Sequence, residues 1–177
     1  HISPIANLDC VDEILIVRDS PGINIDKVRY VNIFHRSVVS PILNIPIKIL
    51  QLVQLIGISL IEKPSLIHSY LLFPYGYMAL IAGKLTRRKV GVSLIAGPVE
   101  TYMLGGSPIG SCPYDRPLPP SNTINSLIIS ILKRFDVITV TGTYTKKYLI
   151  GRGINAEKII ILPHSVDERF VPLAMDK

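Results

Sequence analysis

The sequence predicts an α/β protein with a mostly parallel sheet. Three observations predict it: short apolar runs rich in β-branched residues recur along the chain, helical patterns separate them, and Gly and Pro mark the boundaries. Strand, helix and strand units of this kind form right-handed crossovers, and the carboxyl ends of their strands meet at one edge. We therefore expect a Rossmann-like, doubly wound sheet with helices on both faces and a ligand site at that edge.

Length and composition allow one domain with a sizeable core. The 177 residues are 48% hydrophobic and have a mean hydropathy of +0.40, so the chain is not predicted to be disordered. Cys10 and Cys112 lie far apart, without a CxxC motif or a nearby His pair. Neither a zinc site nor a disulfide framework is predicted, and two cysteines fit a cytoplasmic protein.

The first elements are two strands and a helix. Residues 13–19 and 27–34 are apolar runs separated by a turn at 19–24. Residues 41–62 have a helical period with a narrow polar stripe, formed by Asn44, Lys48, Gln51, Gln54 or Leu55, and Ser59.

Four interpretations of the 41–62 helix compete: a buried crossover helix, a helix in a membrane interface, a transmembrane span and a partner-binding helix. Lys48 and two glutamines argue against a span. An interfacial helix normally has a wide cationic face, whereas this helix has a single lysine. We favour the buried crossover helix and rank membrane contact second.

The next unit runs from 63 to 98. Residues 65–70 predict a strand, Pro74 and Gly76 break the chain, residues 77–86 predict a helix, and residues 89–97 predict another strand. His68 and Tyr70 would emerge at the carboxyl edge, where polar groups reach a ligand. A hydrogen-bonded structural histidine is the alternative for His68.

A long loop follows, from Ala96 to about Ser121, dense in Gly and Pro. A loop of this length in a compact domain is usually functional or disordered. Its tyrosines and Glu100 offer ring faces and hydrogen bonds that suit a sugar or a glycolipid head group, although an ordered lid without a chemical role is the alternative. Residues 122–135 then restore a helical period.

The last unit, 136–172, begins with a buried strand at 136–141. Thr143 can cap the helix that follows, Gly151 or Gly153 can end it, and residues 158–163 predict the final strand. Lys146 and Lys147 lie in the first turns of the helix, where the macrodipole disfavours a cation unless an anion is bound. They are candidate phosphate contacts, with a solvated helix face as the alternative.

Other cations lie where a helix ends before a strand, which is the edge opposite the predicted site. At such positions they complement helix C-termini and favour solubility. The net charge of +6 therefore does not predict a nucleic-acid partner, because no basic stretch alternates with stacking aromatics. These cations are Lys84, Arg87, Arg88, Lys89, Lys133 and Arg134.

The last unit also resembles the end of the N-terminal domain of retaining family-4 glycosyltransferases of the GT-B fold. The matching residues are Gly153, Ile154, Glu157, Lys158, Ile159, Pro163, Val166, Asp167, Arg169, Phe170 and Pro172. The resemblance extends from roughly Glu62 to Pro172, and His68 matches a family histidine at the end of a strand. It implies that His164 and Asp167 lie in a hinge, although His164-Ser165 replaces the usual Asn-Gly.

The resemblance implies a domain organisation. Residues 1–172 would be the acceptor-side domain, and residues 163–177 would begin the hinge to a C-terminal donor domain beyond Lys177. Complete family members begin with a further strand, which would be central in the sheet. We therefore expect this chain to be a fragment that lacks this first strand.

The resemblance further implies that the full enzyme transfers a hexosyl unit from a nucleotide sugar to a glycan, glycolipid or small acceptor, with retention and without a metal. Ala96 replaces a family histidine near the reacting sugars, so Glu100 or Tyr102 is expected to substitute for it. Thr143 matches a family serine. The expected acceptor-binding residues are His68, Tyr70, Gly97, Glu100, Tyr102, Thr143 and Tyr144.

We expect the fragment alone to be inactive. We expect the protein to be located in the cytoplasm, at the cytoplasmic face of the membrane. Two alternatives remain. One is a noncatalytic membrane-docking subunit that recruits a separate donor-binding domain. The other is a different GT-B enzyme, such as a sugar-nucleotide epimerase.

Overall fold

The structure, a computed structural model, describes residues 3–18, 22–32, 44–101 and 122–162. Within these ranges all paired strands are parallel. A two-stranded sheet consists of β1 (Ile14–Arg18) and β2 (Val28–Asn32). A four-stranded sheet has the order β3 (Leu66–Ser69), β4 (Lys89–Leu94), β5 (Val137–Val140) and β6 (Ile159–Ile161).

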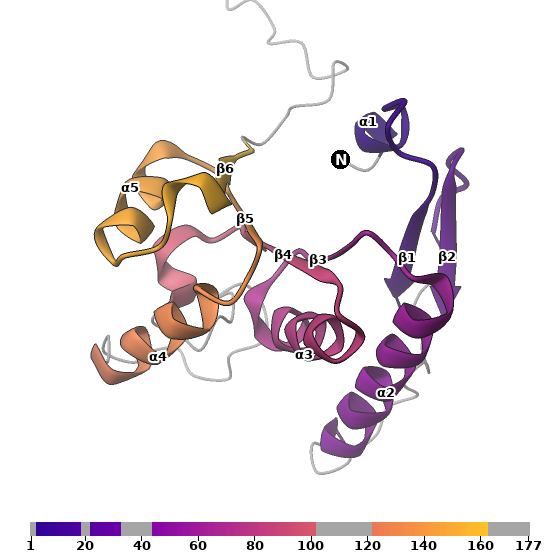
Figure 1. Cartoon of the computed structure of the whole chain (residues 1–177), viewed down its shortest axis with the longest axis horizontal. Helices are drawn as coiled ribbons and strands as arrows, with labels where there is room; N and C mark the ends of the chain where they lie inside the picture. The colour runs from indigo at the N-terminus through magenta and orange to yellow at the C-terminus, as the bar shows by residue number, and fades with distance from the viewer. Residues whose placement is uncertain (1–2, 19–21, 33–43, 102–121, 163–177) are drawn as a thin grey trace, which may run out of the picture.

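Helices connect these strands. The α-helices are α1 (Ser3–Ala6), α2 (Asn44–Glu62), α3 (Tyr77–Thr86), α4 (Asn122–Leu132) and α5 (Thr143–Gly151). Shorter helical turns are η2 (Leu72–Gly76), η3 (Gly97–Thr101) and η4 (Ala156–Lys158). This arrangement confirms the predicted α/β, Rossmann-like fold class. Because consecutive strands are neighbours and such crossovers are right-handed, α3, α4 and α5 lie along one side of the four-stranded sheet (Figure 1).

The core lies between these helices and the sheet. It contains alternate residues of β4 and β5 together with the inner side of α4. Burying one such side chain stabilises the fold by about 1.5–3 kcal/mol. Fully buried members include Val90, Val92, Leu94, Ile128, Leu132, Phe135, Ile138 and Leu149.

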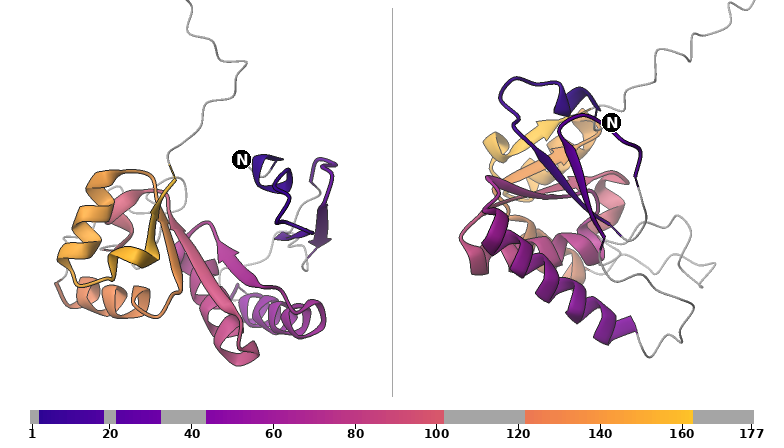
Figure 2. Two further views of the ribbon diagram at one scale, coloured as in Figure 1. Left: turned by 45° about the horizontal axis from the view of Figure 1, so that its top comes forward. Right: turned by 90° about the vertical axis from the view of Figure 1, so that its right-hand side faces the viewer.

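The two-stranded sheet stands apart from the four-stranded sheet (Figure 2). Arg29 of β2 links it to the end of α2, because its guanidinium contacts Glu13 Oε1 at 2.6 Å and Glu62 Oε1 at 3.0 Å. These three side chains are 36–47% exposed, so the pairs contribute little stability. The additional central strand expected from the sequence stays a prediction.

The boundaries of α5 differ from the prediction at one end. Gly142, in an extended conformation, is the N-cap, and no side chain caps the helix. Thr143 is already the first helical residue, so the predicted Thr143 cap is wrong. The predicted C-terminal end is confirmed: the helix ends at Gly151, and Gly153 has φ +80°, a conformation that glycine adopts without strain.

The orientation of α2 corrects the preferred interpretation of this helix. Gln51 and Ser59, from its polar stripe, are buried, whereas several aliphatic side chains face away from the protein. The predicted core helix is therefore covered on one side only, where Leu55 and Ile56 also pack against the core, and it is exposed on the other. Among the described residues, no helix has the length and apolar character needed to cross a membrane. The exposed aliphatic side chains are Ile49, Leu50, Val53, Leu60 and Ile61.

Candidate functional site

His68 belongs to a row of polar side chains that crosses three strands. Its Nε2 atom lies 2.8 Å from Ser93 Oγ on β4, and this oxygen lies 2.6 Å from Thr139 Oγ1 on β5. Gly91, which pairs with His68 in the sheet, leaves room for the imidazole, because a Cβ at Gly91 would lie 2.4 Å from His68 Nδ1. The imidazole therefore lies across β4.

The surroundings of His68 favour the neutral imidazole. Desolvation against the sheet lowers the pKa of His68 below its ordinary value. The ring of Tyr70 meets the imidazole edge to face, with ring centroids 5.9 Å apart, and is exposed at the end of β3. A neutral imidazole beside an exposed phenol can accept or donate hydrogen bonds to sugar hydroxyls. The hydrogen bond to Ser93 also gives His68 a structural role.

The turn after β4 approaches the first turn of α5. Gly97 has φ +73°, where other residues would be strained, and a Cβ there would lie 3.2 Å from Thr145 Oγ1. The structure therefore places Gly97 next to the start of α5. Thr143 and Tyr144 are exposed at this start, and both are available to a ligand.

Glu100 lies beneath this edge, with 0% of its side chain exposed. Its Oε1 atom accepts a 2.7 Å hydrogen bond from the Ala96 N–H, which closes the turn after β4. Burial raises the pKa of Glu100, and the backbone N–H groups of Ala96, Leu72 and Ile95 oppose this shift. Oε2 has no hydrogen-bond partner among the described residues. In this conformation the Glu100 carboxyl group is enclosed by the protein and holds the turn after β4.

A buried polar cluster, not predicted from the sequence, fixes η3 between α4 and α5. Asn125 Nδ2 donates hydrogen bonds of 2.8 Å to Thr101 Oγ1 and to Tyr148 Oη. Thr101 Oγ1 in turn donates to Pro98 O at 2.7 Å. The sequence feature that could have predicted this cluster is Asn125, an amide at a core position of a helical period that is otherwise apolar. Ser93 and Thr139 are similar features, because they are polar residues within apolar strands.

The two candidate phosphate contacts differ. Lys147 is exposed, whereas Lys146 Nζ donates a 3.0 Å hydrogen bond to the carbonyl oxygen of Ile159 in β6. Lys146 therefore links α5 to the neighbouring strand. An anion contact by either lysine stays a prediction.

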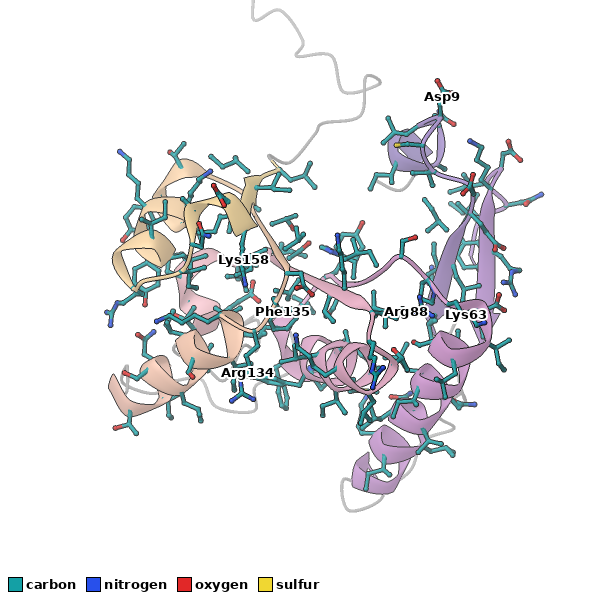
Figure 3. All side chains as sticks on the ribbon, viewed as in Figure 1. Asp9, Lys63, Arg88, Arg134, Phe135 and Lys158 are labelled. Atoms are coloured by element: carbon teal, nitrogen blue, oxygen red, sulfur yellow. The ribbon has the colours of Figure 1, made fainter. Side chains whose placement is uncertain are left out.

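The structure thus forms two groups at the carboxyl ends of the strands: His68 with Tyr70, and Gly97 with the start of α5. Glu100 lies inside. Tyr102, His164 and Asp167 lie outside the described residues. Lys158, by contrast, directly precedes β6 and complements the end of α4, because its Nζ contacts Lys133 O at 3.2 Å and Phe135 O at 3.0 Å; Figure 3 labels Lys158 and Phe135.

Two shallow hollows among the described residues lie away from both groups. One, of about 410 Å³, is lined by Asn125, Ser126, Ile129, Ser130, Lys133, Gly151 and Arg152. The other, of about 340 Å³, is lined by Gly83, Lys84, Arg87, Arg88, Lys89 and Asp136. None of the predicted site residues lines either hollow, so neither locates the site.

Comparisons with known proteins give one family. A search of curated proteins found no match to the chain. The family model described as Glycosyltransferase Family 4 matches residues 11–170. This match covers almost the whole chain, including both groups of residues at the carboxyl ends of the strands. The chain therefore belongs to Glycosyltransferase Family 4.

Proposed function

We propose that this chain is the acceptor-binding half of a retaining glycosyltransferase. In this proposal the complete enzyme moves a hexosyl unit from a nucleotide sugar to a glycan, glycolipid or small acceptor. A second domain binds the donor, no metal takes part, and the chain alone does not catalyse transfer. The family membership supports the transferase class, and the arrangement of the carboxyl-edge residues supports the acceptor role.

The approach of the turn after β4 to the start of α5 carries the proposal. Gly97 allows the backbone to come close to Thr145, which leaves Thr143 and Tyr144 exposed on a firmly packed helix. An exposed phenol ring and hydroxyl suit the apolar face and the hydroxyls of a sugar. We assign Tyr144 a stacking role and Thr143 a hydrogen-bonding role toward the acceptor.

His68 and Tyr70 form the second part of the proposed acceptor surface. The neutral imidazole, oriented by Ser93, would act as a hydrogen-bond partner of an acceptor hydroxyl. Glu100 is proposed to act as a positioning residue because its carboxylate holds the Ala96 N–H within the turn. The substitute for the family histidine at Ala96 would then be a group other than Glu100, and Tyr102 is the remaining candidate.

Transfer of a labelled hexose is the test. The isolated chain of 177 residues, incubated with nucleotide sugars and a panel of glycan and lipid acceptors, should produce no labelled product. The natural protein that contains this chain together with a donor-binding domain should produce it. Transfer by the isolated chain would refute the division of labour.

Variants of the complete protein then test the acceptor surface. Tyr144→Ala should lower kcat/KM by about tenfold or more if the ring stacks on the acceptor, because the contact contributes to transition-state binding. Leu127→Ala is the matched control, since Leu127 is an exposed side chain on α4 that has no part in the proposed site. Equal kcat/KM values for the two variants would remove Tyr144 from the acceptor site.

A noncatalytic docking subunit is the second candidate. Ala96 offers no proton donor and Glu100 is buried, so the turn after β4 supplies no side chain for proton transfer among the described residues. This candidate predicts that the complete protein, too, lacks transferase activity while it still recruits a separate donor-binding domain.

A further inference from the structure

Among the described side chains of α2, those that face outward around Gly57 are aliphatic. Ile49, Val53 and Leu60 lie within a narrow angular range of the helix, and Leu50 and Ile61 extend the same side. Gly57 lies among them, and a Cβ there would meet no atom within 4 Å. Scattered exposed apolar side chains are ordinary in proteins, but a continuous aliphatic strip along a helix marks an interaction site.

Specific contacts on the opposite side fix this orientation. Lys48 Nζ donates to Gln51 Oε1 at 2.9 Å and to Tyr75 Oη at 3.3 Å, and it lies 4.6 Å from the centroid of the Tyr75 ring. A rotation of α2 that buried its aliphatic side would break these contacts and expose the polar stripe instead. The outer strip is therefore a fixed feature of the fold.

The neighbouring helix α3 also carries exposed aliphatic side chains, and cations lie at the ends of both helices. α2 packs against α3, whose Ile81 and Leu85 are also exposed. At the C-terminal ends of the two helices lie the cations Lys63, Lys84, Arg87, Arg88 and Lys89, of which Lys63 and Arg88 are labelled in Figure 3.

Two acidic groups lie near these five cations, Asp136 in the same hollow as four of them and Glu62 at the end of α2. Asp136 accepts a 2.8 Å hydrogen bond from the Val90 N–H, and Glu62 contacts Arg29 at 3.0 Å. Because five cations outnumber two carboxylates, the end of the aliphatic strip carries a net positive charge. This combination of charge and apolar surface determines which occupant fits.

We propose that the strip on α2 and α3, which we call the docking strip, binds the surface of an anionic membrane. The aliphatic side chains would enter the boundary between head groups and acyl chains, and the cations would contact anionic head groups. A second copy of the chain is disfavoured because two strips would bring like charges together. The docking strip lies on α2 and α3 rather than at the proposed acceptor site, so docking does not depend on the transferase proposal.

Vesicle flotation with the purified chain tests this. The chain should float with vesicles of phosphatidylcholine and phosphatidylglycerol in equal parts, and much less with phosphatidylcholine alone. Binding should weaken as salt is added, because the electrostatic part is screened. Lys84→Gln should lower the affinity about fivefold, the contribution of one cation near an anionic surface.

The decisive variant is Val53→Gln with Leu60→Gln. Both side chains are exposed, so the fold should keep its thermal unfolding temperature, whereas vesicle affinity should fall by about tenfold or more. Leu127→Gln on α4 is the matched control, because Leu127 and Leu60 are both 57% exposed. It should float like the unmodified chain.

Three results would overturn the proposal: no flotation of the unmodified chain, equal flotation of the double variant and the unmodified chain, or equal losses in the double variant and the control. If the chain were instead a dimer that the double variant converts to monomers without any vesicle binding, the strip would be a contact between copies. Sedimentation of the same samples separates that case. Because flotation involves no sugar transfer, its outcome is distinct from the outcome of the transferase test.

Discussion

Helices α2 and α4 have similarly apolar sequences but expose their aliphatic side chains to different extents. On α4, Ile128, Ile129 and Leu132 point into the core, and serines face outward. On α2 the buried side carries Gln51 and Ser59 beside Leu55 and Ile56, and five further aliphatic residues face outward. The aliphatic residues of a helix therefore do not all lie on its inner side, and the contacts available to the polar residues help to decide which side is covered.

The difference follows from what each helix packs against. α4 covers strands that present Val92, Leu94 and Ile138, so apolar side chains fill its inner side. α2 lies beside α3 and the turn η2, where Tyr75 offers a hydroxyl and a ring face to a lysine. Lys48, Gln51 and Ser59 are tolerated there because they find partners, whereas Gln54 Oε1 is buried without a hydrogen-bond partner among the described residues.

The largest expected effect is the difference between two leucine substitutions in the free energy of unfolding. Leu132→Ala should lower the free energy of unfolding by about 2–5 kcal/mol, because Leu132 on α4 is 0% exposed and its truncation leaves a cavity. Leu60→Ala on α2 should change it by less than about 0.5 kcal/mol, since the side chain faces outward. Urea unfolding measures both. Similar losses would mean that the outer side of α2 is covered in solution.

A smaller effect is expected for the pair that orients α2. Lys48→Met should cost about 1–3 kcal/mol, because Gln51 is only 6% exposed and its Oε1 would lose the Lys48 donor. Adding Gln51→Leu should recover most of this loss, since two apolar groups leave no unpaired atom. A double-mutant cycle in urea measures the coupling. Additive losses would show that other contacts set the orientation.

Local patterns in the sequence predicted the elements well. The helix expected at 77–86 is found at Tyr77–Thr86, and the strand expected at 65–70 is found at Leu66–Ser69. These elements have strong hydrophobic periods, and the first is preceded by Pro74 and Gly76. The predicted cap at Thr143 failed because the extended Gly142 takes the cap position, and a choice between neighbouring residues is beyond pattern analysis.

Features that depend on distant residues could not be predicted. The orientation of α2 depends on Tyr75, which is 27 residues from Lys48. The burial of Glu100 depends on backbone N–H groups from two separate loops. The row from His68 to Thr139 could in part have been anticipated, because polar residues within buried strands usually have partners across the sheet. Of the candidate site, the sequence could predict which strand ends contribute, but not which side chains are exposed there.

The smallest expected effect concerns Ser59, the most buried polar residue of the α2 stripe at 1% exposed. Its Oγ donates a 2.7 Å hydrogen bond to Leu55 O, one turn earlier in the same helix. The Leu55 carbonyl oxygen is also a backbone acceptor within the helix, so Ser59→Ala removes the hydroxyl without leaving a polar group unpaired. Alanine also has the higher helix propensity. The free energy of unfolding should therefore change by less than about 0.5 kcal/mol in either direction. A loss as large as that of Lys48→Met would indicate that the whole stripe, rather than Lys48 and Gln51, orients α2. Urea unfolding of the two variants side by side decides between these cases.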